Sequence, residues 1–246
     1  MRMDRRRLLL GLTVVISLPA LVWGYFDYRT WYDLGAGGVP QNLVGWAMVT
    51  AARPLKIDPH DIKGFEQNIG RGSDIVTLND LPRRSGGRPE IAPHPIPHRQ
   101  LTQTGAPTML TALQSSIDEL VQRNRELLEF RTSRFETHNA AVWLRKPAAG
   151  NPDTLSGGEV AHVHPSDGSM HVILSPSDAK LVMEAGWGEL HPISGYGPLA
   201  PSYMMLYAAR TAEEVDVIER IVRAGVRYAQ NAPAGRVAEQ TPELGH

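Results

Sequence analysis

Residues 159–174, EVAHVHPSDGSMHVIL, decide the predicted fold because two runs of alternating side chains flank a turn. The middle of the stretch, Pro165-Ser166-Asp167-Gly168, consists of residue types that favour turns. We therefore expect a β-hairpin with a four-residue loop. A loop of that length places His162 directly opposite His171, and directly opposed residues share one face of a sheet.

The two faces of this hairpin differ in chemistry. Period-two alternation puts an unbroken apolar set on the face that we expect to be the core, namely Ala161, Val163, Met170, Val172 and Leu174. The opposite face gathers three imidazoles beside the carboxylate of Asp167, and its members are Val160, His162, His164, His171 and Ile173. A change of one residue in the loop would turn His171 to the other face.

Three clustered imidazoles fit three kinds of role. His-x-His on a strand directs two ligands the same way, so His162, His164 and His171 could bind a metal ion. Imidazole titrates near neutral pH, so the cluster could instead supply a general base or bind a substrate. The third interpretation is a hydrogen-bonded histidine face without function. Spacing alone leaves all three open.

Patterns on both sides of the hairpin predict the remaining elements. The expected order is a helix over 108–131, a strand over 134–146, the hairpin, a helix over 175–186, a strand over 202–209 and a helix from the capping box Thr211-x-x-Glu214. The strand over 134–146 would bring Glu136 and His138 next to the hairpin histidines. This order predicts an α+β fold in which an antiparallel sheet carries helices on one face.

The N-terminus predicts a transmembrane helix. Arg2, Arg5, Arg6 and Arg7 precede an apolar run over 8–26 with aromatic residues at its end. Residues 1–32 are therefore expected to form an uncleaved, single-pass membrane anchor, of the endoplasmic reticulum type in a eukaryote. A cleaved signal peptide and a buried helix are the alternatives. A second apolar stretch, 43–52, could lie on or re-enter the membrane.

The expected organisation has four parts: the anchor over 1–32, a Pro/Gly-rich wrapping segment over 33–107 with membrane-surface contact, an α+β domain over 108–232 and a tail over 233–246. Prolines flank His94 and His98, so both are expected on the surface rather than in a site. The formal net charge of −1 argues against a nucleic-acid partner. The absence of cysteine excludes disulfides and thiolate metal sites.

Candidate site residues also lie outside the hairpin. In the predicted loop 187–201, Trp187 stands between two glycines and either lines a pocket or plugs the core, while His191 offers a further imidazole. Tyr203 and Tyr207 are expected to be half-buried strand residues. Arg134 either contributes charge to the site or forms an ion pair at a strand end.

These residues belong to an ordered series of motifs that resembles the luciferases of luminous mushrooms. The series comprises Pro40-Gln41-Asn42, the segment 88–100, Ser133-Arg134-Phe135-Glu136 with His138, Ala161-His162-Val163-His164, Met170-His171, Gly186-Trp187-Gly188 with His191-Pro192 and Gly195, Leu206-Tyr207-Ala208, and Pro233-Ala234-Gly235. The resemblance covers most of the chain, including the N-terminus.

The resemblance implies oxygen chemistry on 3-hydroxyhispidin, a hydroxylated styryl-pyranone. Oxygen would add to the pyranone and give a cyclic peroxide, and loss of carbon dioxide would leave an excited product that emits light. The resemblance implies no metal or organic cofactor, with oxygen as co-substrate. A histidine would remove the enol proton, and a second histidine or Arg134 would stabilise the developing negative charge. The candidate catalytic residues are then His162, His164, His171, His138 and Glu136, and the candidate substrate-binding residues are Arg134, Asp167, Trp187, His191 and Tyr207.

One departure from the family concerns the turn between His164 and His171. Luminous members carry a longer turn with histidine and aspartate, whereas many relatives with the compact form come from organisms not known to glow. Fold, anchor and pocket are expected to carry over, but neither light emission nor this luciferin is implied. Three functions therefore compete: a luciferase-type, cofactor-free enzyme that acts with oxygen on a flat phenolic or pyranone compound; a non-luminous, metal-assisted enzyme on another small molecule; and a non-catalytic membrane-bound binding protein.

Overall fold

The computed structural model describes the backbone of residues 5–71, 74–146 and 157–230, and the side chains of these ranges from residue 18 onward. The predicted tail over 233–246 and the Pro233-Ala234-Gly235 motif lie outside the described residues.

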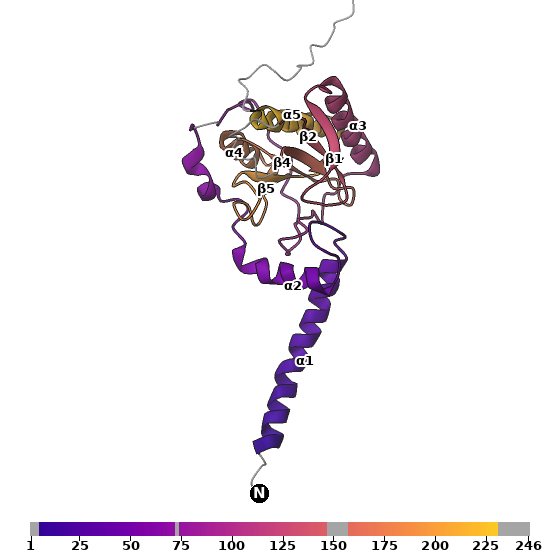
Figure 1. The fold of residues 1–246 in the computed structure, drawn as a ribbon, viewed down its shortest axis with the longest axis vertical. Helices are drawn as coiled ribbons and strands as arrows, with labels where there is room; N and C mark the ends of the chain where they lie inside the picture. Colours follow the sequence, from indigo (N-terminus) through magenta and orange to yellow (C-terminus); the bar gives the residue numbers. More distant parts are fainter. Residues whose placement is uncertain (1–4, 72–73, 147–156, 231–246) are drawn as a thin grey trace, which may run out of the picture.

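One antiparallel sheet organises the described chain, with its strands in the order β1-β2-β3-β4-β6-β5 (Figure 1). The strands are β1 (Leu128–Thr132), β2 (Ala140–Leu144), β3 (Glu159–Val163), β4 (Met170–Ile173), β5 (Gly188–Leu190) and β6 (Tyr203–Leu206). All five neighbouring pairs run antiparallel. The predicted α+β class with an antiparallel sheet is confirmed.

The hairpin of β3 and β4 has the predicted register. His162 lies opposite His171, and the His164 N–H donates to the Ser169 carbonyl at 2.8 Å. Gly168 closes the turn at φ +76°, where its lack of a Cβ avoids the strain that other residues meet. The four-residue loop therefore gathers the three histidines on one face, as the sequence predicts.

Two helices cover the apolar face of the sheet. They are α3 (Pro107–Arg123) and α5 (Ala212–Ala229), which lie on the same side of the strands in Figure 1. Thr211 caps α5 by accepting a hydrogen bond from the Glu214 N–H, as the capping box predicts. Gly225 lets α5 approach closely, because a Cβ there would lie 2.6 Å from the Ile173 carbonyl oxygen.

A third helix, α4 (Pro176–Ala185), also matches its prediction. The Ser175 hydroxyl caps its N-terminus, and Gly186 ends it in the left-handed region at φ +81°. The carboxylate of Asp178, in the first turn, accepts hydrogen bonds from the Thr77 and Leu78 N–H groups. These bonds fasten the wrapping segment to the sheet domain.

The wrapping segment covers the second face of the sheet. Gln100 secures it there, because its N–H donates to Asp167 and its side-chain oxygen accepts from the Ala208 N–H. Both faces are therefore buried, and the histidine face is interior rather than open. The prediction that His94 and His98 lie on the surface is wrong, since each is 1% exposed.

Local boundaries differ from the sequence prediction in three places. The helix expected over 108–131 ends at Arg123, and a turn over 124–127 leads into β1. The strand expected over 134–146 begins only at Ala140, because the Ser133 hydroxyl accepts from the Phe135 and Glu136 N–H groups and turns the chain. The short strand β5 lies within the expected loop 187–201.

The N-terminal part is helical but does not match the predicted anchor. Helix α1 (Arg5–Tyr32) extends from the domain, and α2 (Leu43–Ala52) lies across its end (Figure 1). Three 3-10 turns follow, Arg53–Leu55, Ile62–Gly64 and Glu66–Asn68. Among the described residues, no helix has both the length and the apolar character needed to cross a bilayer. The predicted transmembrane helix and single-pass membrane location are therefore wrong.

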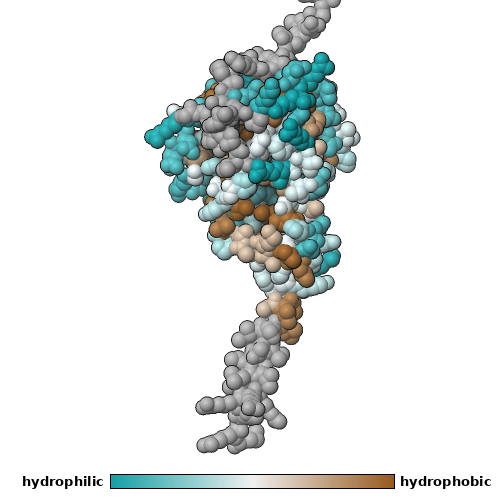
Figure 2. Space-filling view, in the orientation of Figure 1, coloured by the Kyte–Doolittle hydropathy of each residue, from teal (hydrophilic) through white to brown (hydrophobic). Residues whose placement is uncertain are grey.

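Helices α1 and α2 are joined to the domain by a polar contact at Asp27. Its carboxylate accepts hydrogen bonds from Arg53 and Trp46, both at 2.7 Å, and lies 3.3 Å from the buried ring of His94. Apolar side chains gather at this end of the described surface, and polar ones at the opposite end (Figure 2). His94 is therefore buried by this junction.

Candidate active site

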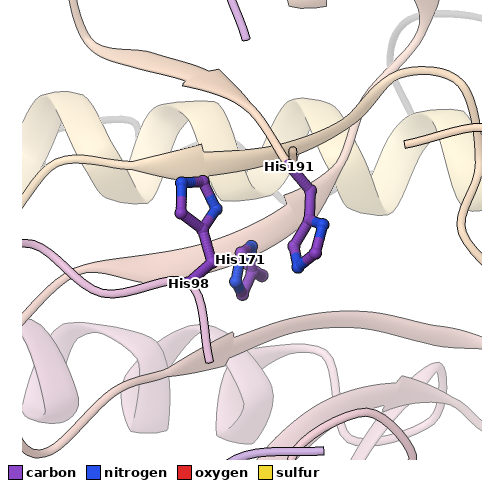
Figure 3. A group of neighbouring side chains, drawn as sticks. All are labelled: His98, His171 and His191. Atoms are coloured by element: carbon purple, nitrogen blue, oxygen red, sulfur yellow. The ribbon is translucent and has the colours of Figure 1, made fainter. Parts of the chain in front are cut away.

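Five buried histidines meet on the second face of the sheet. β3 and the residue after it carry His162 and His164, β4 carries His171, the end of β5 leads to His191, and the wrapping segment supplies His98. Figure 3 shows His98 and His191 on either side of His171. The ring centroids of neighbouring pairs in the cluster are 4.7–5.4 Å apart. We call these five residues the histidine cluster.

A β-bulge gives His162 a carboxylate partner. The register between β2 and β3 shifts at Trp143, so that Trp143 opposes Glu159 while Ala141 opposes His162. Residues 141 and 143 share a face, and the bulge therefore turns Glu159 to the side of His162. The Glu159 Oε1 lies 2.7 Å from His162 Nδ1. Ser133 Oγ and the Arg134 N–H also donate to this carboxylate, so His162 Nδ1 carries a proton.

His164 is held by a hydroxyl that links it to a second carboxylate. Its Nδ1 lies 2.8 Å from Ser169 Oγ, and that hydroxyl donates to Asp167 Oδ1 at 2.8 Å. Since the Ser169 proton goes to Asp167, His164 Nδ1 is the donor in the first bond. Burial raises the pKa of Asp167, although hydrogen bonds from Ser169 and Gln100 oppose this effect.

His171 and His191 form hydrogen bonds with backbone groups and differ in tautomer. His171 donates its Nδ1 proton to the Met204 carbonyl at 3.1 Å, and its ring stacks on Tyr203 with a centroid distance of 4.9 Å. His191 Nδ1 instead accepts from the Ile193 N–H at 3.3 Å. A neutral His191 therefore carries its proton on Nε2, whereas a neutral His171 carries it on Nδ1.

His98 has a buried carboxylate behind it. Its Nε2 lies 3.0 Å from Glu189 Oε1, and the other oxygen of Glu189 accepts from the Tyr207 hydroxyl at 2.9 Å. Burial opposes ionisation of Glu189, but the hydrogen bonds from His98 and Tyr207 outweigh it and lower its pKa. His98 Nε2 is therefore the donor, and Nδ1 keeps the lone pair. The segment 88–100 was among the motifs of the resemblance, and that signal could have identified His98.

Burial keeps three members of the cluster neutral. Desolvation holds the pKa of His164, His171 and His191 well below the usual value, with further lowering by Arg99 at His164 and by neighbouring imidazoles at all three. Three ring nitrogens of the cluster are buried without a hydrogen-bond partner among the described residues, namely His98 Nδ1, His162 Nε2 and His164 Nε2. The site therefore presents several buried lone pairs.

A cavity of about 220 Å³ opens beside the cluster. Its polar lining includes His98, His162, His171, His191 and Glu136, and its apolar walls include Ile96, Phe135, Ile193, Tyr196 and Leu199. Ligand pockets combine apolar walls with a few convergent polar groups in this way. A second cavity, of about 300 Å³, lies on the helix side of the sheet and shares only His162 with the cluster among its described lining residues. We therefore assign the site to the first cavity.

The other predicted site residues fall into two groups. Glu136 and Arg134 reach the cavity. Glu136 is buried and paired with Arg99 at 2.6 Å, whereas Arg134 is exposed. His138 is exposed and its Nδ1 lies 2.5 Å from the Glu136 carbonyl, so the structure does not bring it into the cluster.

Two aromatic candidates lie outside the cavity lining. Trp187 packs in the core rather than lining the cavity, because it is 3% exposed and its Nε1 donates to the Pro82 carbonyl. Tyr207 is fully buried behind Glu189 rather than half-buried, and it acts on the site through that carboxylate. Tyr203 is also buried, against His171.

Comparison with known proteins finds relatives that are luciferases. A family model described as Luciferase domain matches residues 157–225. A luciferase of Neonothopanus nambi is 33% identical over 87% of this chain and 84% of its own length, and one of Armillaria ostoyae is 31% identical over 86% and 83%. A luciferase of Armillaria mellea is 30% identical over 90% of this chain and 87% of its own. No solved structure matches the chain.

Proposed function

Since this chain belongs to the fungal luciferase family, we propose that it is an oxygen-dependent enzyme that oxidises a flat hydroxylated pyranone such as 3-hydroxyhispidin. The observation that carries the proposal is the cavity of about 220 Å³ whose apolar walls close over buried, unpartnered imidazole nitrogens. Sites for drug-sized ligands measure about 300–1,000 Å³, and this cavity is smaller. Its size suits one small planar molecule.

His98 is the general base in this proposal. His98 lines the cavity, and its buried Nδ1 has no partner among the described residues. Glu189 fixes the tautomer by accepting from Nε2, and its negative charge stabilises the imidazolium that forms when Nδ1 takes a proton. The proton taken is that of the enol hydroxyl, which leaves an electron-rich enolate.

Negative charge on the substrate needs a donor, and His191 supplies one. Its Nδ1 accepts from the Ile193 N–H, so its Nε2–H is available to the cavity that His191 lines. Arg134 adds a positive charge at the exposed side of the same cavity. Fixed donors in a water-poor site stabilise developing charge more strongly than water does.

The reaction balances without an external reductant. The enolate adds dioxygen to give a cyclic peroxide, and its breakdown releases carbon dioxide and a carbonyl product. One pyranone and one dioxygen are consumed for each carbon dioxide released, and the substrate supplies the electrons that reduce oxygen. Light emission depends on how the excited product is held, and the assay reads it separately from turnover.

The test uses the purified full chain with 3-hydroxyhispidin, reading oxygen uptake and light together. His98→Gln keeps an N–H near Glu189 but removes the base, so we expect the rate to fall about 10²–10⁴-fold, as for loss of a general base. His138→Gln is the matched control, because His138 is exposed and lies outside the cluster. Wild-type oxygen uptake by His98→Gln would remove His98 from this role, and no uptake by the wild-type chain would refute the substrate.

A further inference from the structure

The three hairpin histidines surround a common point. The candidate ligand atoms of His162, His164 and His171 lie within 4.8 Å of one another, and all three side chains are buried. Nitrogen ligands at about 2.1 Å from a tetrahedral ion lie about 3.4 Å apart. Small ring rotations about the side-chain bonds would therefore close the three nitrogens around one ion.

The hydrogen bonds already put each ring in the ligand tautomer. Nδ1 of each ring is occupied by an acceptor: Glu159 for His162, the Ser169 hydroxyl for His164 and the Met204 carbonyl for His171. Nε2 of each neutral ring therefore keeps its lone pair. Metal-bound histidines characteristically donate their second nitrogen to a carboxylate, carbonyl or similar group, which fixes the ring and raises its basicity.

Two of these lone pairs have nothing to bind in the protein itself. His162 Nε2 and His164 Nε2 are buried and have no hydrogen-bond partner among the described residues. Buried polar atoms are normally satisfied, so two such nitrogens in one cluster of potential metal ligands call for a ligand. We propose that His162, His164 and His171 together bind a divalent transition-metal ion of the class of Zn²⁺ and Co²⁺. Imidazole ligands suit this class of ion.

The tautomers of the rings distinguish the three hairpin histidines from the neighbouring set of histidines that Figure 3 shows. His98, His171 and His191 also have ligand atoms within 4.8 Å of one another. However, the Ile193 N–H occupies His191 Nδ1, so the Nε2 of the neutral ring carries a proton and cannot coordinate. The hairpin set meets the tautomer requirement at all three positions, and we therefore choose it.

The surrounding charges suit a cation. Glu159 stands behind His162, and Asp167 stands behind His164 through Ser169. Glu136 Oε1 lies 3.9 Å from His164 Nε2, and its charge is shared with Arg99. The described charged side chains around the three histidines are thus three carboxylates and one guanidinium, that of Arg99. His162 and His171 also line the cavity, so a bound ion would have an open position facing it.

This inference departs from the absence of a metal that the family resemblance implies, and it does not depend on the proposed function. Binding is measured without substrate, so its failure leaves the proposed oxidation untouched. The full chain is first stripped of metal with a chelator. Zn²⁺ and Co²⁺ are then titrated by calorimetry, and Co²⁺ also by its visible absorption. We expect one ion per chain and the absorption bands of four- or five-coordinate Co²⁺.

Matched variants identify the ligands. His162→Asn keeps an N–H near Glu159 but removes Nε2, and we expect at least about 100-fold weaker binding, more than loss of an outer partner causes. Glu159→Gln keeps the ring and should weaken binding about 10–100-fold, which serves as the decisive variant if His162→Asn does not fold. His138→Asn and His191→Asn should bind like the wild type.

Two results would overturn the proposal. One is the absence of stoichiometric Zn²⁺ or Co²⁺ binding by the folded wild-type chain. The other is binding that His191→Asn weakens and His162→Asn or Glu159→Gln leaves unchanged, because that pattern assigns the ion to the other histidine set. Melting curves recorded alongside confirm that each variant compared is folded.

Discussion

Acidification of the metal-free protein should destabilise it steeply, because three imidazoles are buried as neutral groups. Burial holds the pKa of His164, His171 and His191 well below the usual value. In the unfolded chain the same groups titrate near pH 6.5, so below that pH the unfolded state binds more protons than the native state. Stability is therefore present above about pH 6.5 and is lost as pH falls.

The slope follows from the number of groups. Each fully titrating histidine contributes about 1.4 kcal/mol per pH unit, so three contribute about 4 kcal/mol per pH unit between about pH 6 and 5. A typical domain has about 5–15 kcal/mol of unfolding free energy, so such a slope is a large fraction of the total. The raised pKa values of Asp167 and Asp178 act with the opposite sign, at pH values above the usual aspartate pKa of about 4.

The assay is urea unfolding in chelator at a series of pH values between 7 and 5, which spans about the range where histidine titrates. His191→Asn removes one buried imidazole and should reduce the slope by about 1.4 kcal/mol per pH unit. His138→Asn changes an exposed ring and should leave the slope as it is. A wild-type slope near zero would refute the burial of neutral imidazoles on which the site description rests.

Two further substitutions test how the sheet faces are built. Gly225→Ala should lower the unfolding free energy by about 1–3 kcal/mol, because the new Cβ would lie 2.6 Å from the Ile173 carbonyl oxygen. An unchanged melting curve would contradict the close approach of α5 to the sheet. Ser169→Ala removes the hydroxyl between His164 and Asp167 and leaves buried polar atoms unpaired, so it should lower the unfolding free energy by about 1–3 kcal/mol. Chemical unfolding at neutral pH measures this loss. An unchanged unfolding free energy would contradict the assigned hydrogen bonds.

The hairpin was predictable because its information is local. Alternation fixed the two faces, and the turn residues at 165–168 fixed the loop length, so the pairing of His162 with His171 followed. The capping residues of α4 and α5 were visible for the same reason, since Ser175 and Thr211 act on N–H groups three residues away.

The rest of the site depends on contacts between distant segments. His98 reaches Glu189 across 91 positions, and proline-flanked sequence gave no periodic pattern from which to infer that burial. The bulge that turns Glu159 toward His162 reverses the face that simple alternation assigns to it. The prediction for His138 failed because Ser133 turns the chain where a strand was expected.

Burial also changes how the histidines should be tested. His162 and His171 lie on the face of the sheet that the wrapping segment covers, and each is 3% exposed or less. His162 also satisfies a buried carboxylate. Alanine would leave that carboxylate without a partner, so amide substitutions separate chemistry from folding more cleanly.

The most direct test of the proposed oxidation is the ratio of carbon dioxide released to oxygen consumed by the full chain with 3-hydroxyhispidin. The account predicts one carbon dioxide for each dioxygen, with loss of both signals in His98→Gln. It also predicts no turnover of the same pyranone without its 3-hydroxyl, because His98 then has no enol proton at that carbon to remove. Oxygen uptake without carbon dioxide, or equal turnover of the compound that lacks the 3-hydroxyl, would contradict it.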